Sequence, residues 1–199
     1  MKQGRKISIV SRMFAVLLAV MMVCSNISLP SKAAETVQTI AAWEYKDKYS
    51  APSSLPAGAT SGSGQLNVTG ATYTGYSSKS LAANNWEEEG SWTISEINAE
   101  KYENFMVIHK KNSLRSSNTG AKNFQLEYSL DKGQSWMVVA GGAVEITSTN
   151  LTQLYKDVKL PAELSGKNFT LRVKKVGTTS VNGGTVALTG ASNINHIVI

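Results

Sequence analysis

Cysteine is almost absent from this sequence of 199 residues, which contains only Cys24. Cys24 ends an apolar run, residues 13–24, that follows a basic N-terminus and precedes small residues at positions 31 and 33. This order predicts a secretory signal peptide over residues 1–33, because the run is shorter than a comfortable membrane span. The remaining chain would be secreted and extracellular, without a membrane span and without a thiol, so its core rather than disulfides must hold it.

A strong excess of positive charge is also missing once the leader is set aside. The whole sequence has 20 basic and 14 acidic residues, a formal net charge of +6. Five of the basic residues lie within residues 1–33, so fifteen basic side chains face 14 acidic ones in the rest and the net charge falls to +1. A nearly neutral chain lacks the basic surface that nucleic-acid binding requires, and we expect no nucleic-acid partner.

Helical periodicity and catalytic motifs are scarce as well. The sequence has no Gly-x-Ser-x-Gly, no phosphate-binding loop and no His-Glu-x-x-His. Its two histidines, His109 and His196, lie in strand patterns, and two histidines without a spaced carboxylate are a weak metal site. The run Glu87-Glu88-Glu89 is interpreted as a solvated loop, with a structural Ca²⁺ ion as the alternative. We therefore expect no enzyme activity and no cofactor.

What the sequence has in abundance is alternation of apolar and polar residues between turn signals. Residues 46–64 and 70–85 are rich in Gly, Ser, Ala and Asn and predict loops, while residues 151–160 fit either a strand or a short amphipathic helix. The pattern indicates an all-β protein, an antiparallel β-sandwich formed by one domain over residues 34–199. The predicted strands are residues 37–45, 65–69, 91–97, 105–109, 124–129, 137–140, 168–176 and 194–199.

Residues 124–136, FQLEYSLDKGQSW, predict the most recognisable β-hairpin of the chain. The segment from Ser129 to Trp136 reads S-x-D-x-G-x-S-W and resembles the Asp box, with Ser in place of Thr at the seventh position. Asp131 can accept hydrogen bonds from the turn, and Gly133 can supply a positive φ. Because these roles concern the turn itself, we interpret the motif as a structural element that fixes strand register.

A wider resemblance joins the Asp box with residues 40–45 (IAAWEY), 169–173 (FTLRV) and 194–199 (INHIVI). Together they resemble a jelly-roll, galactose-binding-like module of secreted bacterial proteins, which is similar to carbohydrate-binding modules. The resemblance implies an accessory module that precedes an extracellular nuclease, phosphatase or other hydrolase domain. The last strand of that family carries Asp-Asn where this chain has Asn195-His196, so a carboxylate-dependent ion site is not implied there.

Aromatic residues in the polar segments are the candidates for a binding site. Sugar-binding modules stack exposed aromatic rings on pyranose C–H surfaces and use nearby polar side chains for the hydroxyl groups. The candidates are Tyr73, Tyr76, Trp86, Asn85 and Glu87. The alternative is that the rings cap the edge of the sandwich, where burial stabilises an aromatic side chain. The sequence therefore predicts a non-catalytic module that binds a polysaccharide or a cell-surface glycan, with a structural or protein-interaction module as the alternative and a hydrolase with an unrecognised site as the second.

Overall fold

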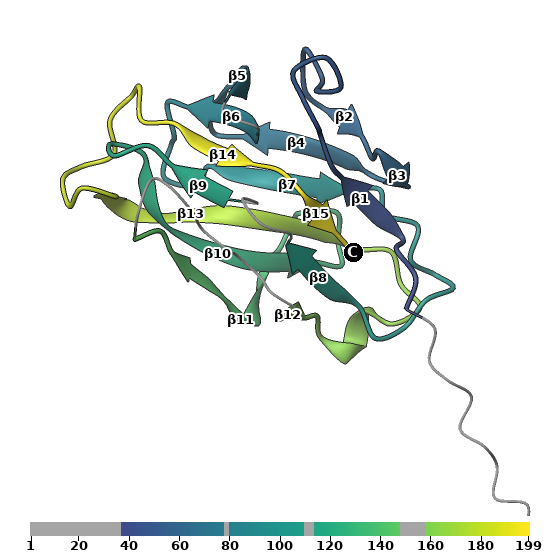
Figure 1. Cartoon of the computed structure of the whole chain (residues 1–199). Helices are drawn as coiled ribbons and strands as arrows, with labels where there is room; N and C mark the ends of the chain where they lie inside the picture. The colour runs from purple at the N-terminus through teal and green to yellow at the C-terminus, as the bar shows by residue number, and fades with distance from the viewer. Residues whose placement is uncertain (1–36, 78–79, 110–113, 148–157) are drawn as a thin grey trace, which may run out of the picture. The chain divides into compact units, whose positions relative to one another are not determined.

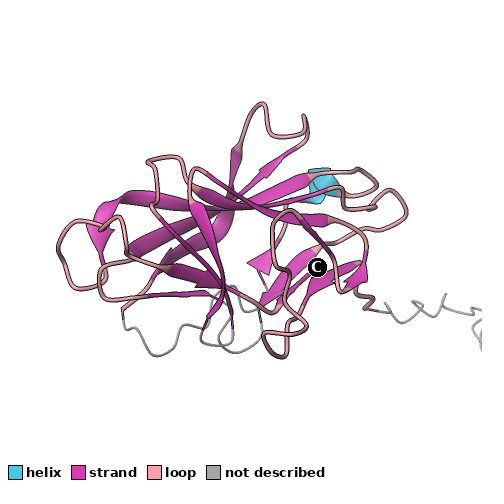
Figure 2. Cartoon of the chain, turned by 90° about the horizontal axis from the view of Figure 1, so that it is seen from above, coloured by secondary structure: helices cyan, strands magenta, loops and turns pink. Residues whose placement is uncertain are grey.

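Alternating apolar and polar residues form antiparallel strands in the computed structural model, which describes residues 37–77, 80–109, 114–147 and 158–199. Residues Gln38–Ile199 form one compact unit, and the predicted signal peptide lies outside the described residues. Strands and loops make up almost all of this unit, with one turn of 3-10 helix, η1 (Ala162–Leu164), in its described part (Figure 2). The prediction of an all-β antiparallel sandwich is confirmed.

The strands are arranged in three sheets. The six-stranded sheet has the order β11 (Met137–Glu145), β10 (Ala121–Ser129), β13 (Thr170–Ser180), β7 (Ser91–Ser95), β4 (Gln65–Thr69), β2 (Ala57–Gly58). The five-stranded sheet has the order β12 (Val158–Lys159), β8 (Met106–His109), β15 (Ile197–Val198), β1 (Ala41–Trp43), β3 (Ser61–Gly62). The four-stranded sheet has the order β5 (Thr72–Ser77), β6 (Ser80–Asn84), β14 (Ser192–Ile194), β9 (Leu114–Ser116). In Figure 1, β14 and β15 run across β7 and β13, which places the two smaller sheets in the layer opposite the six-stranded one.

The core lies between these two layers and is built from inward-facing residues of all three sheets. Trp43 and Trp92 are fully buried, and they come from opposite layers. Phe105 and Phe169 meet edge to face with ring centroids 5.1 Å apart. Buried aromatic rings contribute a large apolar area and favourable edge-to-face contacts. A core of this size can therefore stabilise the sandwich without disulfides.

Several segments expected as loops contain strands. The stretch predicted as a loop over residues 70–85 forms the β5–β6 hairpin, and residues 46–64 contain the short strands β2 and β3. Strand β11 also continues through Gly141-Gly142, where a break was expected. The two glycines instead accompany a β-bulge, because Gly141 has a φ of +74° and a side chain at Gly142 would meet Leu126 Cβ at 2.8 Å. Turn-type composition therefore misled the prediction at positions where glycine serves a bulge.

The last predicted strand, residues 194–199, is divided between two sheets. Strand β14 pairs with β6 and β9, whereas β15 pairs with β1 and β8. Asn195 and His196 lie at the junction, and His196 has a φ of +51° that turns the chain. The Asn195 side chain is buried there and bonds to the backbone of Tyr45. The junction thus holds the backbone of Tyr45, two residues after the end of β1.

Candidate binding surfaces

Trp86, the aromatic residue expected to stack on a sugar, lies in the core. Its side chain and backbone are 9% exposed, and its ring meets Trp92 and Phe124 edge to face at centroid distances of 5.8 Å and 6.2 Å. The indole Nε1 donates a hydrogen bond to the carbonyl of Ala83 at 3.0 Å. A ring enclosed in this way offers no free face, so the expectation of an exposed Trp86 is wrong.

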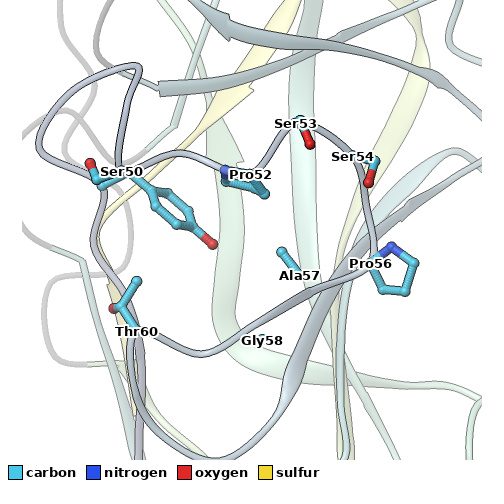
Figure 3. Close-up of a pocket in the computed structure, with 9 residues that line it drawn as sticks. Ser50, Pro52, Ser53, Ser54, Pro56, Ala57, Gly58 and Thr60 are labelled. Atoms are coloured by element: carbon cyan, nitrogen blue, oxygen red, sulfur yellow. The ribbon is translucent and has the colours of Figure 1, made fainter.

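Tyr73 and Tyr76 are half-buried and hold neighbouring loops instead of pointing freely outward. Tyr73 Oη donates to the carbonyl of Pro52 at 2.7 Å, and Tyr76 Oη donates to the carbonyl of Tyr45 at 3.4 Å. Burial raises the pKa of both phenols, so both remain donors at neutral pH. Pro52 and Tyr45, whose carbonyls accept these hydrogen bonds, both line a hollow in the β1–β2 loop (Figure 3).

Asn85 and Glu87, the polar partners expected beside Trp86, are exposed in the connection from β6 to β7. Asn85 adopts a φ of +52°, a conformation that Asn tolerates better than most residues, and its N–H donates to the carbonyl of Leu188. The N–H of Glu87 donates to the carbonyl of Gly70. The structure therefore gives both residues a place in the connection that follows β6, where their backbone N–H groups are bonded.

The Asp-box turn between β10 and β11 is closed by its own side chains. Ser129 Oγ donates to Asp131 Oδ1 at 2.6 Å, and the Ser135 N–H and hydroxyl donate to the same carboxylate at 2.9 Å and 2.5 Å. These hydrogen bonds hold the pKa of Asp131 well below its usual range. Gly133 has a φ of +90°, and a side chain there would meet the Trp136 ring at 3.1 Å. The turn carries the ring of Trp136 toward strand β13.

The outward-facing side chains of the six-stranded sheet are polar along four strands, and we call this set the polar face; its members Ser91 and Glu127 are buried, and the others are partly or fully exposed. Its residues alternate along four strands with core residues such as Leu66, Trp92 and Val173. One row across the sheet pairs Glu127, Arg172, Thr93 and Asn67 in register, and the next row pairs Gln125, Lys174, Ser91 and Thr69. At about 4.8 Å between neighbouring strands, each row spans roughly 14 Å. The polar face consists of Gln65, Asn67, Thr69, Ser91, Thr93, Ser95, Gln125, Glu127, Arg172 and Lys174.

Ion pairs fix the charged groups at one end of the polar face. Arg172 Nε and Nη2 each lie 2.6 Å from Glu127 Oε2, and the two side chains are only 13% and 11% exposed. Glu89 reaches over from the β6–β7 connection, with Oε1 2.6 Å from Lys174 Nζ and Oε2 3.7 Å from Arg172 Nη2. Hydrogen bonding to Lys174 lowers the pKa of Glu89. These contacts fix the orientations of the Arg172 guanidinium and of the Glu127 and Glu89 carboxylates.

Trp136 lies against this network. The Arg172 guanidinium carbon is 4.3 Å from the centroid of the indole, a cation–π distance, and the indole is half-buried. Beside it, Glu88, Glu89, Gln125, Glu127, Lys174, Lys175, Val176 and Gly177 line a hollow of about 330 Å³. Three acidic and two basic side chains line this hollow, so its formal charge is −1.

Much of the polar face follows from strand alternation, which already predicts Arg172 and Lys174 on the outward side. The same alternation places Gln125 and Glu127 outward on β10, but it does not reveal which strands lie side by side. In the order β10–β13–β7–β4, Thr93 pairs with Asn67 on one side and with Arg172 on the other, so residues 105 positions apart in the sequence flank the same residue. Sequence reasoning therefore missed the site because it looked for a local cluster.

Comparisons with known proteins give one likeness in fold. A solved structure, the carbohydrate-binding module CBM29_1 of family 29 from Piromyces equi, aligns with a TM-score of 0.47 and 11% identity. The alignment covers 82% of this chain and 89% of that one. No protein-family model and no curated protein matches the chain.

Two further observations concern the described ranges of the chain. In that part of the chain, no three His, Cys, Asp or Glu side chains gather in a way that could hold a metal ion. No helix in the same residues has the length and apolar character needed to cross a membrane.

Proposed function

We propose that the protein is a secreted, non-catalytic module that binds a polysaccharide or a cell-surface glycan and serves an extracellular hydrolase as an accessory part. The observation that carries this proposal is the row Glu127–Arg172–Thr93–Asn67, which crosses four strands and in which Arg172 stacks on Trp136. The polar face thus takes the place of the Trp86 cluster expected from the sequence.

The chemistry of the polar face suits a chain of hydroxyl groups. Glycan recognition requires donors and acceptors held in fixed positions, because every ordered side chain otherwise loses rotamer freedom on binding. The ion pairs of Arg172 with Glu127 and of Lys174 with Glu89 supply that order before a ligand arrives. The half-buried ring of Trp136 adds an apolar surface beside the polar row. A sugar has both hydroxyl groups and apolar C–H surfaces, so it can contact the polar row and the ring at the same time.

Binding should be measured by affinity electrophoresis of the purified protein through gels containing soluble glucan, xylan or mannan, with pull-down on cellulose, chitin and cell walls. Trp136→Ala is expected to weaken retention by roughly 30-fold, the loss typical of a central Trp contact. Asn67→Ala is expected to weaken it by about fivefold, because Asn67 bonds only the N–H of the next residue within the protein and its amide is available for one hydrogen bond.

Asn118→Ala is the matched control, because Asn118 is exposed in the β9–β10 turn and does not belong to the polar face. The control should retain full binding, and all three variants should unfold cooperatively. Absence of retention on every glycan and cell wall would refute the proposal. Equal losses in Asn67→Ala and Asn118→Ala would refute the assignment of the polar face.

A protein-interaction module remains the second candidate, and β11 is the observation that favours it. Strand β11 is the outermost strand of the six-stranded sheet within the described residues, and it exposes Met137 and Val138, the latter by 63%. An edge strand with exposed apolar residues can accept a strand from a partner. Val138→Lys should abolish capture of a neighbouring hydrolase domain under this alternative.

A further inference from the structure

The loop between β1 and β2 surrounds a hollow of about 400 Å³ that shares no lining residue with the polar face. Figure 3 shows the segment from Ser50 to Thr60 running around it, with Pro52, Ser53 and Ser54 on one side and Gly58 and Thr60 on the other. A water molecule occupies roughly 30 Å³ in the liquid, so the hollow has room for a small organic molecule. The lining residues are Tyr45, Ser50, Pro52, Ser53, Ser54, Pro56, Ala57, Gly58 and Thr60.

Tyr45 contributes a buried hydroxyl group to this hollow. The residue is 4% exposed, and its Oη has no hydrogen-bond partner among the residues that the structure describes. Native proteins pair the great majority of their buried polar atoms, so an unpaired hydroxyl in the wall of a hollow points to a partner from outside the protein. Burial, with a smaller contribution from Tyr73, raises the pKa of Tyr45 to about 12, which keeps the hydroxyl able to donate as well as accept.

The wall around this hydroxyl is held by residues from the layer of the two smaller sheets. Asn195 clamps the backbone of Tyr45, accepting from its N–H at 3.0 Å and donating to its carbonyl at 2.9 Å. Tyr73 holds the carbonyl of Pro52 at 2.7 Å, and Trp43 donates to the carbonyl of Ala57 at 3.3 Å. The hollow is therefore preformed, which reduces the ordering cost of binding.

The lining selects for a neutral ligand, because it carries no charged side chain and could not compensate a buried charge. The hydroxyl groups of Ser50 and Thr60 are already engaged, since they donate to the carbonyls of Asp47 and Ala42. Tyr45 Oη at the wall and the exposed serines at the rim are left for polar contacts, while the two proline rings provide apolar surface. Polar groups combined with aliphatic surface match a molecule with hydroxyl groups on a carbon ring.

We propose that this hollow is a second binding site, which takes a neutral hydroxylated molecule the size of one sugar unit and hydrogen-bonds it through Tyr45 Oη. The site stands on residues that the polar face does not use, so it can exist whether or not the polar face binds a polysaccharide. Tyr73 and Asn195 act as positioning residues, because they hold the wall and leave the ligand to Tyr45.

The test is a titration of the ¹⁵N-labelled protein with D-glucose, D-galactose, N-acetyl-D-glucosamine and, as a charged comparison, D-glucuronate. At least one neutral sugar should shift the backbone amides of residues 50–60 to saturation, and glucuronate should not. Tyr45→Phe should weaken that binding by roughly fivefold, the effect of one ordinary hydrogen bond. Tyr49→Phe is the matched control, because Tyr49 is 86% exposed in the same loop and should bind like the wild type.

Thermal unfolding without sugar gives an independent readout. Tyr45→Phe should be at least as stable as Tyr49→Phe, because the hydroxyl it removes has no partner in the protein. A clearly lower melting temperature for Tyr45→Phe would show that a structural water already satisfies the group, and this would overturn the proposal. So would equal sugar affinity in Tyr45→Phe and the wild type, or the absence of any shift with the three neutral sugars. Trp136→Ala should leave the titration unchanged, which separates this site from the polar face.

Discussion

Replacing Trp86 tests whether this residue belongs to the core or to a binding site, because the two roles predict different effects on stability and on glycan retention. In Trp86→Ala, the indole that packs against Trp92 and Phe124 at 5.8 Å and 6.2 Å is lost from a site that is 9% exposed. Large-to-small substitutions of this kind cost about 3–5 kcal/mol, from lost burial and the cavity that remains. The hydrogen bond to the carbonyl of Ala83 adds about 1 kcal/mol. Since domains are stable by roughly 5–15 kcal/mol, the variant should be largely destabilised.

Urea unfolding followed by circular dichroism measures this loss as a shift of the midpoint at constant slope. Trp86→Phe is the companion variant, because it keeps an aromatic ring against Trp92 while losing the hydrogen bond to Ala83, and it should lie between Trp86→Ala and the wild type. Glycan retention by whatever fraction of Trp86→Ala remains folded should match that of the wild type. A Trp86→Ala protein that unfolds within about 1 kcal/mol of the wild type and yet loses glycan retention would refute the assignment of Trp86 to the core.

Two further predictions concern backbone positions and pH. Gly62→Ala should destabilise the protein more than Gly141→Ala, although the two glycines have nearly the same φ, +77° and +74°. A Cβ at residue 62 would lie 2.0 Å from the carbonyl oxygen of Ile40, whereas a Cβ at residue 141 would meet nothing within 4 Å. The strained φ alone costs about 1–2 kcal/mol, so Gly141→Ala should lose that amount and Gly62→Ala clearly more; equal unfolding midpoints would contradict this. Asp131→Asn should lower the melting temperature at pH 7, where the wild-type carboxylate is charged and accepts hydrogen bonds from the two serines of the turn. Because the pKa of Asp131 is lower in the folded than in the unfolded protein, the carboxylate stabilises the fold above about pH 4, and this effect is lost as the pH falls further. The difference in melting temperature between Asp131→Asn and the wild type should therefore be smaller at pH 3 than at pH 7. An unchanged difference would contradict the argument.

The strands that the sequence predicted well are those with one buried and one solvated face. Strand β4 has the predicted bounds, and β13 buries Leu171 and Val173 while Arg172 and Lys174 stay partly exposed. Period-two alternation contains this information because each outward residue must be polar. Strand β6 was missed because all but its last residue are buried and are Ser, Leu and Ala, so it shows neither alternation nor β-branched residues.

The candidate sites were harder to predict because their parts meet only after the strands have paired. Trp86 lies in a polar, turn-rich stretch, and local composition suggested exposure, yet its ring turns inward beneath β7 and β10. Trp136 lies in a recognisable turn, and its motif suggested a purely structural residue, yet its ring lies on Arg172 beside the polar face. For both tryptophans, the environment of the ring is set by residues from other strands, and the neighbouring residues in the sequence do not predict it.

Tyr73 and Tyr76 differ from the prediction both in their secondary structure and in their role. Both rings belong to the β5–β6 hairpin, which the sequence presented as a loop, and both hydroxyl groups reach across to the β1–β2 region through Pro52 and Tyr45. A tyrosine that donates to a backbone carbonyl cannot also give that proton to a ligand. The group left for recognition is therefore the hydroxyl of Tyr45, the one member of this tyrosine cluster that no sequence pattern singled out, because it is unpaired in the fold that the other two support.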